Sequence, residues 1–151
     1  MAINTHLADQ KVDKDHLTIE LLGNLDEASS AIGLAKSKSK KNLFILLNQI
    51  QKDLSNFASK VASCNDIEIS TELNWLETKI KDKEKQIDIP NKFVMPGENK
   101  LEANLNFARV IVRRAERRAV KLHKEQKLNK NFLSYLNRLS WFLYLLQIEN
   151  R

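Results

Sequence analysis

The chain has very few residues that break regular secondary structure. It contains only three glycines and two prolines among 151 residues. Sandwiches and barrels need many tight turns, and those turns draw heavily on glycine and proline. Long helices need few connections and exclude both residues from their interiors. Both prolines also lie in one short stretch, residues 87–98. We therefore expect an all-α fold.

Apolar residues recur at steps of three and four in five segments. Leu43, Leu47, Ile50 and Leu54 show the rhythm, which is typical of helices with one buried face. Short polar connections predict antiparallel neighbours, at Ser37–Lys41, Cys64–Asp66 and Lys127–Asn129. No strand pattern or internal repeat is evident. The chain is expected to form one domain over 1–151, a five-helix bundle. Its predicted helices span about 16–36, 42–62, 67–86, 99–126 and 130–149.

Composition indicates a folded, soluble protein. Hydrophobic residues make up 42% and charged residues 29%, an ordinary globular balance. No apolar run approaches the roughly 20 residues needed to cross a bilayer, so no membrane partner is expected. Met1–Gln10 lacks the apolar core of a signal peptide. The single cysteine, Cys64, excludes an internal disulfide and is expected to be small and half-buried. A cytoplasmic location follows from these features.

Positive charge is concentrated in one predicted helix. Residues 109–130 hold nine Lys or Arg against two acids, a net +7, whereas the whole chain is +6. The rest of the chain therefore sums to −1. Such local basicity fits either a solvated helix face or an anionic partner for this one helix.

Four residues in the basic segment share one helical face. Arg109, Arg113, Glu116 and Arg117 stand at i, i+4, i+7 and i+8. Stacked guanidiniums repel one another, and an anion lying along them relieves that repulsion. Glu116 could orient an arginine or form an ordinary intrahelical ion pair. The spacing leaves open a polyphosphate site, a nucleic-acid site and a solvated face.

Other candidate groups point away from a metal or a protein nucleophile. His6, His16 and His123 are scattered, and no second cysteine is present, so we expect surface histidines and no metal site. No glycine-rich phosphate loop occurs. Asp26, beside Glu27, is either an exposed helix acid or a carboxylate that needs an arginine partner. Asn137 and Arg138 fit a polar lock within the bundle as well as a ligand contact.

Several motifs together resemble the ATP:cob(I)alamin adenosyltransferases of the propanediol-utilisation (PduO) type. The resemblance covers about residue 12 to the C-terminus. It is strongest in Arg113-Arg114-Ala115-Glu116-Arg117 and in Tyr135-Leu136-Asn137-Arg138-Leu139-Ser140. Phe93-Val94-Met95-Pro96-Gly97, Gly23-x-Leu25-Asp26-Glu27 and Ile50-Gln51-x-Asp53-Leu54 are similar to further family motifs.

This resemblance implies a ferritin-like five-helix bundle that forms a homotrimer, with ATP and corrinoid at the subunit interfaces. The family transfers the 5′-deoxyadenosyl group of ATP to cob(I)alamin, giving adenosylcobalamin and tripolyphosphate. Because Co(I) is the nucleophile, the protein supplies positioning and charge neutralisation. Magnesium arrives with the ATP phosphates. A flavoprotein reductase and an adenosylcobalamin-dependent enzyme are the implied partners.

The resemblance also implies roles for individual residues. Arg113 pairs with Asp26 across the subunit interface, and these two together with Arg117 form the catalytic set. ATP contacts are implied for Lys14, Arg109, Arg113, Glu116, Arg117 and Asn137. Cobalamin-binding residues are not assigned.

The chain departs from the family pattern at several places. The family's Thr-x-Thr-Gly-Asp-x-Gly-x-Thr segment, which wraps the triphosphate, is not in this chain, which is expected to weaken ATP binding. Trp141 stands where the family has Asp, Asn106 where it has His, Ser29 where it has Asn, and Glu98 where it has Gly. These departures leave an alternative open, a relative that binds corrinoid or nucleotide without efficient transfer. A basic nucleic-acid binder is a third possibility, although few aromatics accompany the basic face.

Overall fold

The computed structural model describes residues 3–64 and 66–151 of the chain. Two short strands precede five helices, which confirms the predicted five-helix fold. The helices end within three residues of their predicted bounds. The elements are β1 (Asn4–Leu7), β2 (Gln10–Asp13), α1 (Leu17–Lys36), α2 (Lys41–Ala62), α3 (Ser70–Glu84), α4 (Lys100–Gln126) and α5 (Lys130–Glu149).

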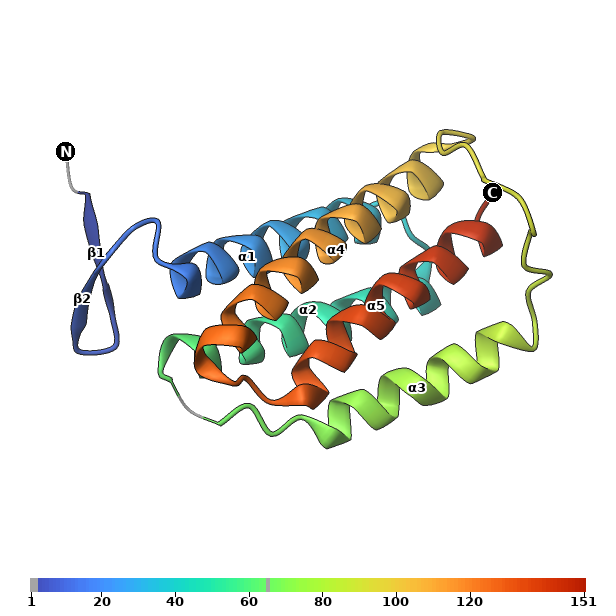
Figure 1. Ribbon diagram of the computed structural model, residues 1–151. Helices are drawn as coiled ribbons and strands as arrows, with labels where there is room; N and C mark the ends of the chain where they lie inside the picture. Colours follow the sequence, from blue (N-terminus) through green and yellow to red (C-terminus); the bar gives the residue numbers. More distant parts are fainter. Residues whose placement is uncertain (1–2, 65) are drawn as a thin grey trace.

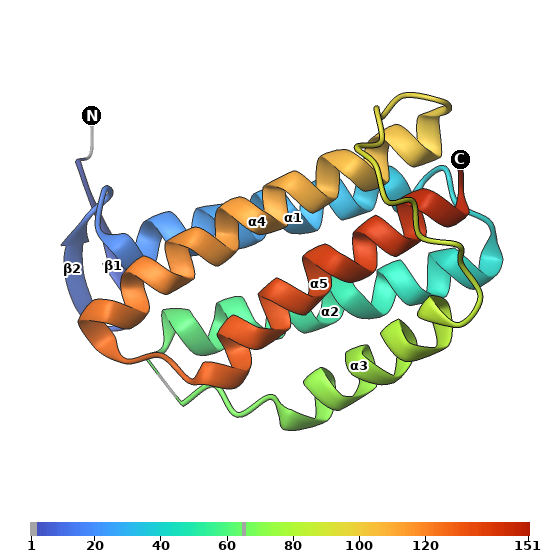
Figure 2. The ribbon, with the colours of Figure 1, turned by 45° about the vertical axis from the view of Figure 1, so that its right-hand side comes forward.

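Successive helices run in alternating directions along one bundle axis (Figure 1). Helix α1 packs against α2 and α4, while α5 packs against α4 and α3. Helix α3 therefore lies outside the four-helix core, covering α5 (Figure 2). The short turn predicted over Cys64–Asp66 includes residue 65, which lies outside the described residues. The core consists mainly of Leu, Ile, Ala and Phe side chains from the helices.

The N-terminal hairpin was not predicted. Strands β1 and β2 pair antiparallel, with Leu7 opposite Gln10, and the hairpin projects from one end of the bundle (Figure 1). Its two-residue turn places Ala8 at φ 51°. Hairpin turns of this kind normally show Gly, Asn or Asp at positive φ, so Ala8 gives no recognisable turn signal. The expectation of no strand was therefore wrong for residues 4–13.

The expected burial of Cys64 was also wrong. The side chain is exposed and the residue lies just beyond α2, at φ 55°. Its position in the turn rather than on the buried face of the helix accounts for the difference.

A buried polar pair joins α2 to α5 inside the apolar core. The Tyr135 hydroxyl donates to Asp53 Oδ2 at 2.8 Å, and Gln49 donates to Asp53 Oδ1 at 2.8 Å. Phe57 packs edge-on against the Tyr135 ring, with centroids 4.8 Å apart. Burial raises the pKa of Asp53 above its ordinary value of 3.8, although the bonds from Tyr135 and Gln49 oppose that rise.

This pair predicts a pH dependence of stability. Because the folded-state pKa of Asp53 is raised, its contribution to stability is greatest below about 3.8 and is lost as pH rises through the folded value. We expect the urea midpoint of the wild type, relative to that of Asp53→Asn, to fall as the pH rises above 4. Urea unfolding at a series of pH values measures the difference. Parallel curves for the two proteins would contradict it.

Candidate functional site

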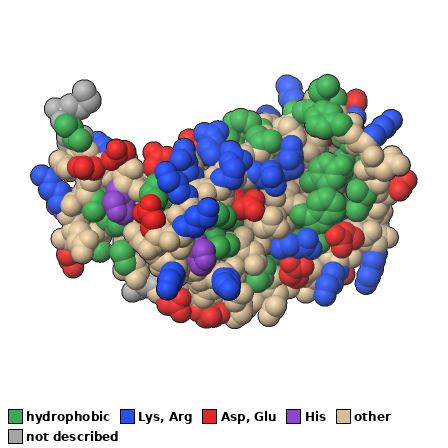
Figure 3. Space-filling model, viewed as in Figure 1, with side chains coloured by type: hydrophobic (Ala, Val, Ile, Leu, Met, Phe, Trp, Pro, Cys, Tyr) green, Lys and Arg blue, Asp and Glu red, His purple; other side chains and the backbone are tan. Residues whose placement is uncertain are grey.

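Helix α4 supplies most of the charged side chains of the candidate site. Asn99 caps its N-terminus by accepting a hydrogen bond from the Glu102 N–H at 2.9 Å. Lys127, in the left-handed conformation, ends it at the other side. Lys and Arg side chains gather over α4 on one face of the molecule (Figure 3). Hydrophobic side chains lie beside them, over the C-terminal half of α5 (Figure 3).

A surface pocket of about 410 Å³ lies between α4 and α5. Two cations from α4 face polar and aromatic side chains from α5 across it. Its lining residues are Arg109, Arg113, Asn137, Arg138, Ser140, Trp141 and Tyr144. This arginine pocket therefore combines three guanidiniums, two from α4 and that of Arg138 from α5, with an aromatic wall.

Arg109 is held in place by Asn106, one turn earlier on α4. Asn106 Oδ1 accepts hydrogen bonds from its Nε at 3.2 Å and its Nη2 at 2.9 Å. Burial lowers the pKa of Arg109 below its ordinary value, and the nearby charge of Arg113 adds to that shift. Both causes disfavour the charged form of Arg109, and an anion between the guanidiniums of Arg109 and Arg113 would offset them.

Glu116 connects the two helices at the edge of the pocket. Asn137 Nδ2 donates to Glu116 Oε1 at 2.9 Å, and Arg113 Nη1 lies 3.9 Å from Glu116 Oε2. Among the described residues, the Arg113 guanidinium makes no other ion pair or hydrogen bond. Glu116 can thus orient Asn137 and Arg113 without neutralising the pocket.

Helix α3 braces the α5 side of the pocket. Glu77 accepts two hydrogen bonds from Arg138, at 2.6 and 3.1 Å, and Glu84 accepts one from Trp141 Nε1 at 2.7 Å. The Trp141 and Tyr144 rings stack with their centroids 5.4 Å apart. Trp141 therefore adds aromatic surface to the pocket at the position where the family pattern has an acid.

The structure brings together only part of the predicted site. Arg109, Arg113 and Asn137 line one pocket, with Glu116 in contact with the latter two. Arg117 instead lines a neighbouring groove together with Arg114, Arg118 and Lys121. Its Nη1 donates to the Arg113 carbonyl at 3.3 Å. The expected single arginine face is therefore divided between two depressions.

Lys14 and Asp26 lie outside the arginine pocket of their own chain. Lys14 is exposed and follows β2, at the base of the hairpin. Asp26 lines a second pocket, of about 490 Å³, between α1 and α4. That pocket is largely apolar and includes the half-exposed Leu34 and Phe107.

The acids around the second pocket differ in their partners. Glu27 pairs with Arg114 at 3.2 Å, and Glu20 pairs with Arg118 at 3.6 Å, so both link α1 to α4. Among the described residues, Asp26 makes no hydrogen bond or ion pair. Its exposure agrees with the interpretation of Asp26 as an exposed helix acid.

Sequence reasoning missed two contributors to the pocket, Tyr144 and the Asn106 support of Arg109. One side of α5 presents four of the pocket residues together, because successive members are separated by three, one and three positions. These residues are Asn137, Ser140, Trp141 and Tyr144. That periodicity was available in the sequence. However, the apolar residues between them predict that α5 is buried on most of its surface, which hides this polar and aromatic face.

Two classes of feature, a metal-binding cluster and a membrane-spanning helix, were also sought among the described residues. They contain no group of three or more His, Cys, Asp or Glu that could hold a metal ion. None of their helices is long and apolar enough to cross a membrane.

Fold and site together define a helical bundle with a surface pocket lined by arginines and aromatic residues. Residues 3–149 match the family model described as cobalamin adenosyltransferase. The chain belongs to this family, which confirms the resemblance seen in its motifs.

Relatives and solved structures agree with this membership. The chain is 35% identical to a corrinoid adenosyltransferase of Bacillus subtilis, over 93% of this chain and 77% of that protein. It is 34% identical to the corrinoid adenosyltransferase PduO of Salmonella typhimurium, over 91% of this chain, but it spans only 43% of that longer protein.

The fold is shared with a PduO-type ATP:corrinoid adenosyltransferase from Lactobacillus reuteri. A variant complexed with ATP superimposes with a TM-score of 0.86 at 27% identity, covering 98% of this chain and 89% of that one. A second variant, complexed with cobalamin and ATP, gives 0.82 at 28% identity, covering 92% and 80%.

Proposed function

We propose that this protein transfers the 5′-deoxyadenosyl group of ATP to the cobalt of cob(I)alamin. The Co(I) electron pair forms a Co–C bond to C5′, the C5′–O bond breaks, and its electrons leave with tripolyphosphate. The products are adenosylcobalamin and tripolyphosphate. The observation that carries the proposal is the pocket in which Arg109 and Arg113 face an aromatic wall.

The residues of the pocket suit this reaction because most of the charge change occurs on the leaving group. Arg109 and Arg113 neutralise the tripolyphosphate, while Asn137, held by Glu116, hydrogen-bonds the nucleotide. Arg117 and Lys14 approach the phosphates from outside the pocket, and magnesium enters with ATP. Since Co(I) is itself a strong nucleophile, no protein nucleophile or general base is needed.

We further propose that the working unit is a homotrimer. Arg113 and Asp26 lie in different pockets, on two sides of α4, and each has unused charge. A ring of three subunits brings one side of each subunit against the other side of its neighbour. The apolar surface around Leu34 and Phe107 is then covered, and Asp26 of one subunit pairs with Arg113 of the next.

Anaerobic incubation with chemically reduced cobalamin, ATP and magnesium tests the transfer. The visible bands of Co(I) are expected to convert to those of adenosylcobalamin only when both protein and ATP are present. A Bacillus subtilis relative assayed in parallel is the control. If the relative is active and the present protein is not, the present protein instead binds corrinoid or nucleotide without transfer.

Location and downstream partners follow from the same proposal. A cytoplasmic site of action, a flavoprotein that supplies the electron for Co(I), and an enzyme that consumes adenosylcobalamin are the expected context.

A further inference from the structure

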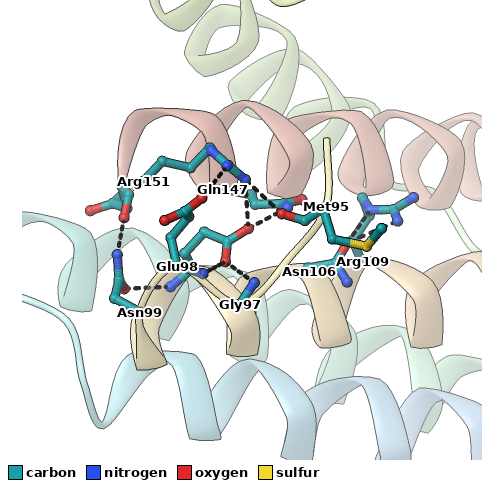
Figure 4. Close-up of polar contacts among 10 residues, drawn as sticks. Met95, Gly97, Glu98, Asn99, Asn106, Arg109, Gln147 and Arg151 are labelled. Atoms are coloured by element: carbon teal, nitrogen blue, oxygen red, sulfur yellow. Dashed lines mark hydrogen bonds and ion pairs between the residues drawn. The ribbon is translucent and has the colours of Figure 1, made fainter. Parts of the chain in front are cut away.

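A buried carboxylate holds the end of the long connection between α3 and α4. Glu102 is fully buried, and its Oε2 accepts hydrogen bonds from the Gly97 N–H at 2.6 Å and the Glu98 N–H at 3.1 Å. Its Oε1 accepts from Gln147 Nε2 at 2.6 Å (Figure 4). Gly97 stands at φ 116°, a conformation that favours glycine and that turns both N–H groups toward the carboxylate.

Arg151 completes the arrangement from beyond α5. Its Nη1 donates to the Met95 carbonyl at 2.9 Å and lies 3.6 Å from Glu102 Oε1, while its Nη2 donates to Glu98 at 2.7 Å. Burial acts to raise the pKa of Glu102. The hydrogen bonds from Gly97, Gln147 and Glu98 and the charge of Arg151 outweigh burial and lower it. Glu102 is therefore ionised at neutral pH. Glu102 and Arg151 are called the latch below.

The latch fixes one part of the connection and leaves the other free. Residues 95–98 are tied to α4 and α5, whereas residues 88–94 take part in no hydrogen bond with any described residue. Phe93 is 83% exposed and Met95 is 71% exposed. Burying a carboxylate is costly unless hydrogen bonds or ion pairs compensate its charge. Because the turn supplies two of the hydrogen bonds to Glu102, a change in the turn geometry would leave that buried charge poorly compensated.

The latch stands on the same side of α4 as the arginine pocket. Glu102, Asn106 and Arg109 occupy positions i, i+4 and i+7 of one helical stripe. At 1.5 Å of rise per residue, Glu102 precedes Arg109 by about 10 Å along the helix. The latched turn therefore lies toward the N-terminal end of α4, on the side of that helix that carries the arginine pocket, and its Met95 side chain is exposed.

We propose that Glu102 is a positioning residue for corrinoid binding, acting through the Met95–Glu98 turn. The inference rests on the proposed function, since it assigns the two substrates to different surfaces. Arg109 and Arg113 suit the triphosphate, whereas the exposed apolar side chains of Met95 and Phe93 suit the apolar faces of the macrocycle. Loss of the latch should therefore weaken corrinoid binding and leave ATP binding almost unchanged.

The test measures turn mobility and ligand affinity in Glu102→Ala, Glu102→Gln and the wild type. In Glu102→Ala, the Gly97 and Glu98 amides are expected to exchange hydrogen at least about tenfold faster, the equivalent of about 1.4 kcal/mol. The Kd for cob(II)alamin, measured with ATP present, should rise by about tenfold, and the Kd for ATP by less than about twofold. Glu102→Gln keeps an oxygen for the two amides and should restore most of both properties.

Tyr135→Phe is the matched control, because it removes a buried hydrogen bond between α2 and α5, away from the latch. It should leave the Gly97 and Glu98 exchange rates and both Kd values within twofold of the wild type. Unchanged exchange in Glu102→Ala would refute the latch. Faster exchange with an unchanged cob(II)alamin Kd, or equal weakening of both ligands, would refute the positioning role. Because neither measurement needs turnover, an inactive wild type would instead count against the proposed transfer.

Discussion

Arg113→Ala is expected to lower the rate of adenosyl transfer by about 10²–10³-fold, the effect of removing one donor that stabilises developing charge. The C5′–O bond breaks with its electrons moving onto a leaving group that already carries several negative charges. Arg113 faces the pocket with most of its donors unused, because its contact to Glu116 is as long as 3.9 Å. The guanidinium can therefore donate to the leaving group in the transition state while Asp26 of the neighbouring subunit orients it, as proposed above. Single-turnover rates with pre-reduced cobalamin measure the loss.

Two variants make this prediction specific. Lys124→Ala removes a positive charge from the exposed last turn of α4, outside the arginine pocket. If the rate loss in Arg113→Ala does not come from the lower net charge of the protein, Lys124→Ala should leave the rate within about twofold of the wild type. Arg113→Lys keeps the charge but lacks the planar fork, so an intermediate rate is expected. An Arg113→Ala rate within threefold of the wild type would remove Arg113 from the reaction.

The helices were the predictable part of this molecule, because the information that forms them is local. Apolar residues at steps of three and four marked each buried face, and the stretch with both prolines marked the one long connection. The hairpin was missed for the opposite reason. Its strands are four residues long, and Ala8 occupies the positive-φ position without a turn residue.

The site was predictable only where its residues share one helix. Arg109 and Arg113 could be grouped by spacing, but the separation of Arg117 into another groove depends on how α5 packs against α4. Glu102 shows the same limit. Glu102 lies three residues after Asn99, the N-cap of α4. An acid at this position normally accepts a hydrogen bond from the backbone N–H of the N-cap residue, forming a capping box. The turn at Gly97 instead brings two earlier amides to it.

Mixing two inactive variants is expected to restore activity if Asp26 and Arg113 meet across a subunit interface. Asp26→Ala and Arg113→Ala should each be nearly inactive alone. In randomly mixed trimers, an interface is intact when an Asp26→Ala subunit supplies Arg113 and its neighbour supplies Asp26. This occurs at about a quarter of the interfaces of a closed ring. Transfer should therefore recover to about a quarter of the wild-type rate after the variants are unfolded together and refolded.

A second mixture distinguishes exchange between subunits from other causes of recovery. Arg109 and Arg113 line the same pocket of one chain, so a mixture of Arg109→Ala with Arg113→Ala leaves every pocket with one defect. That mixture should remain inactive. Light scattering should give three times the 17.5 kDa chain mass for the wild type. A monomeric mass, or no recovery with Asp26→Ala, would show that Arg113 works without Asp26, and the free charge of Asp26 would then need another explanation.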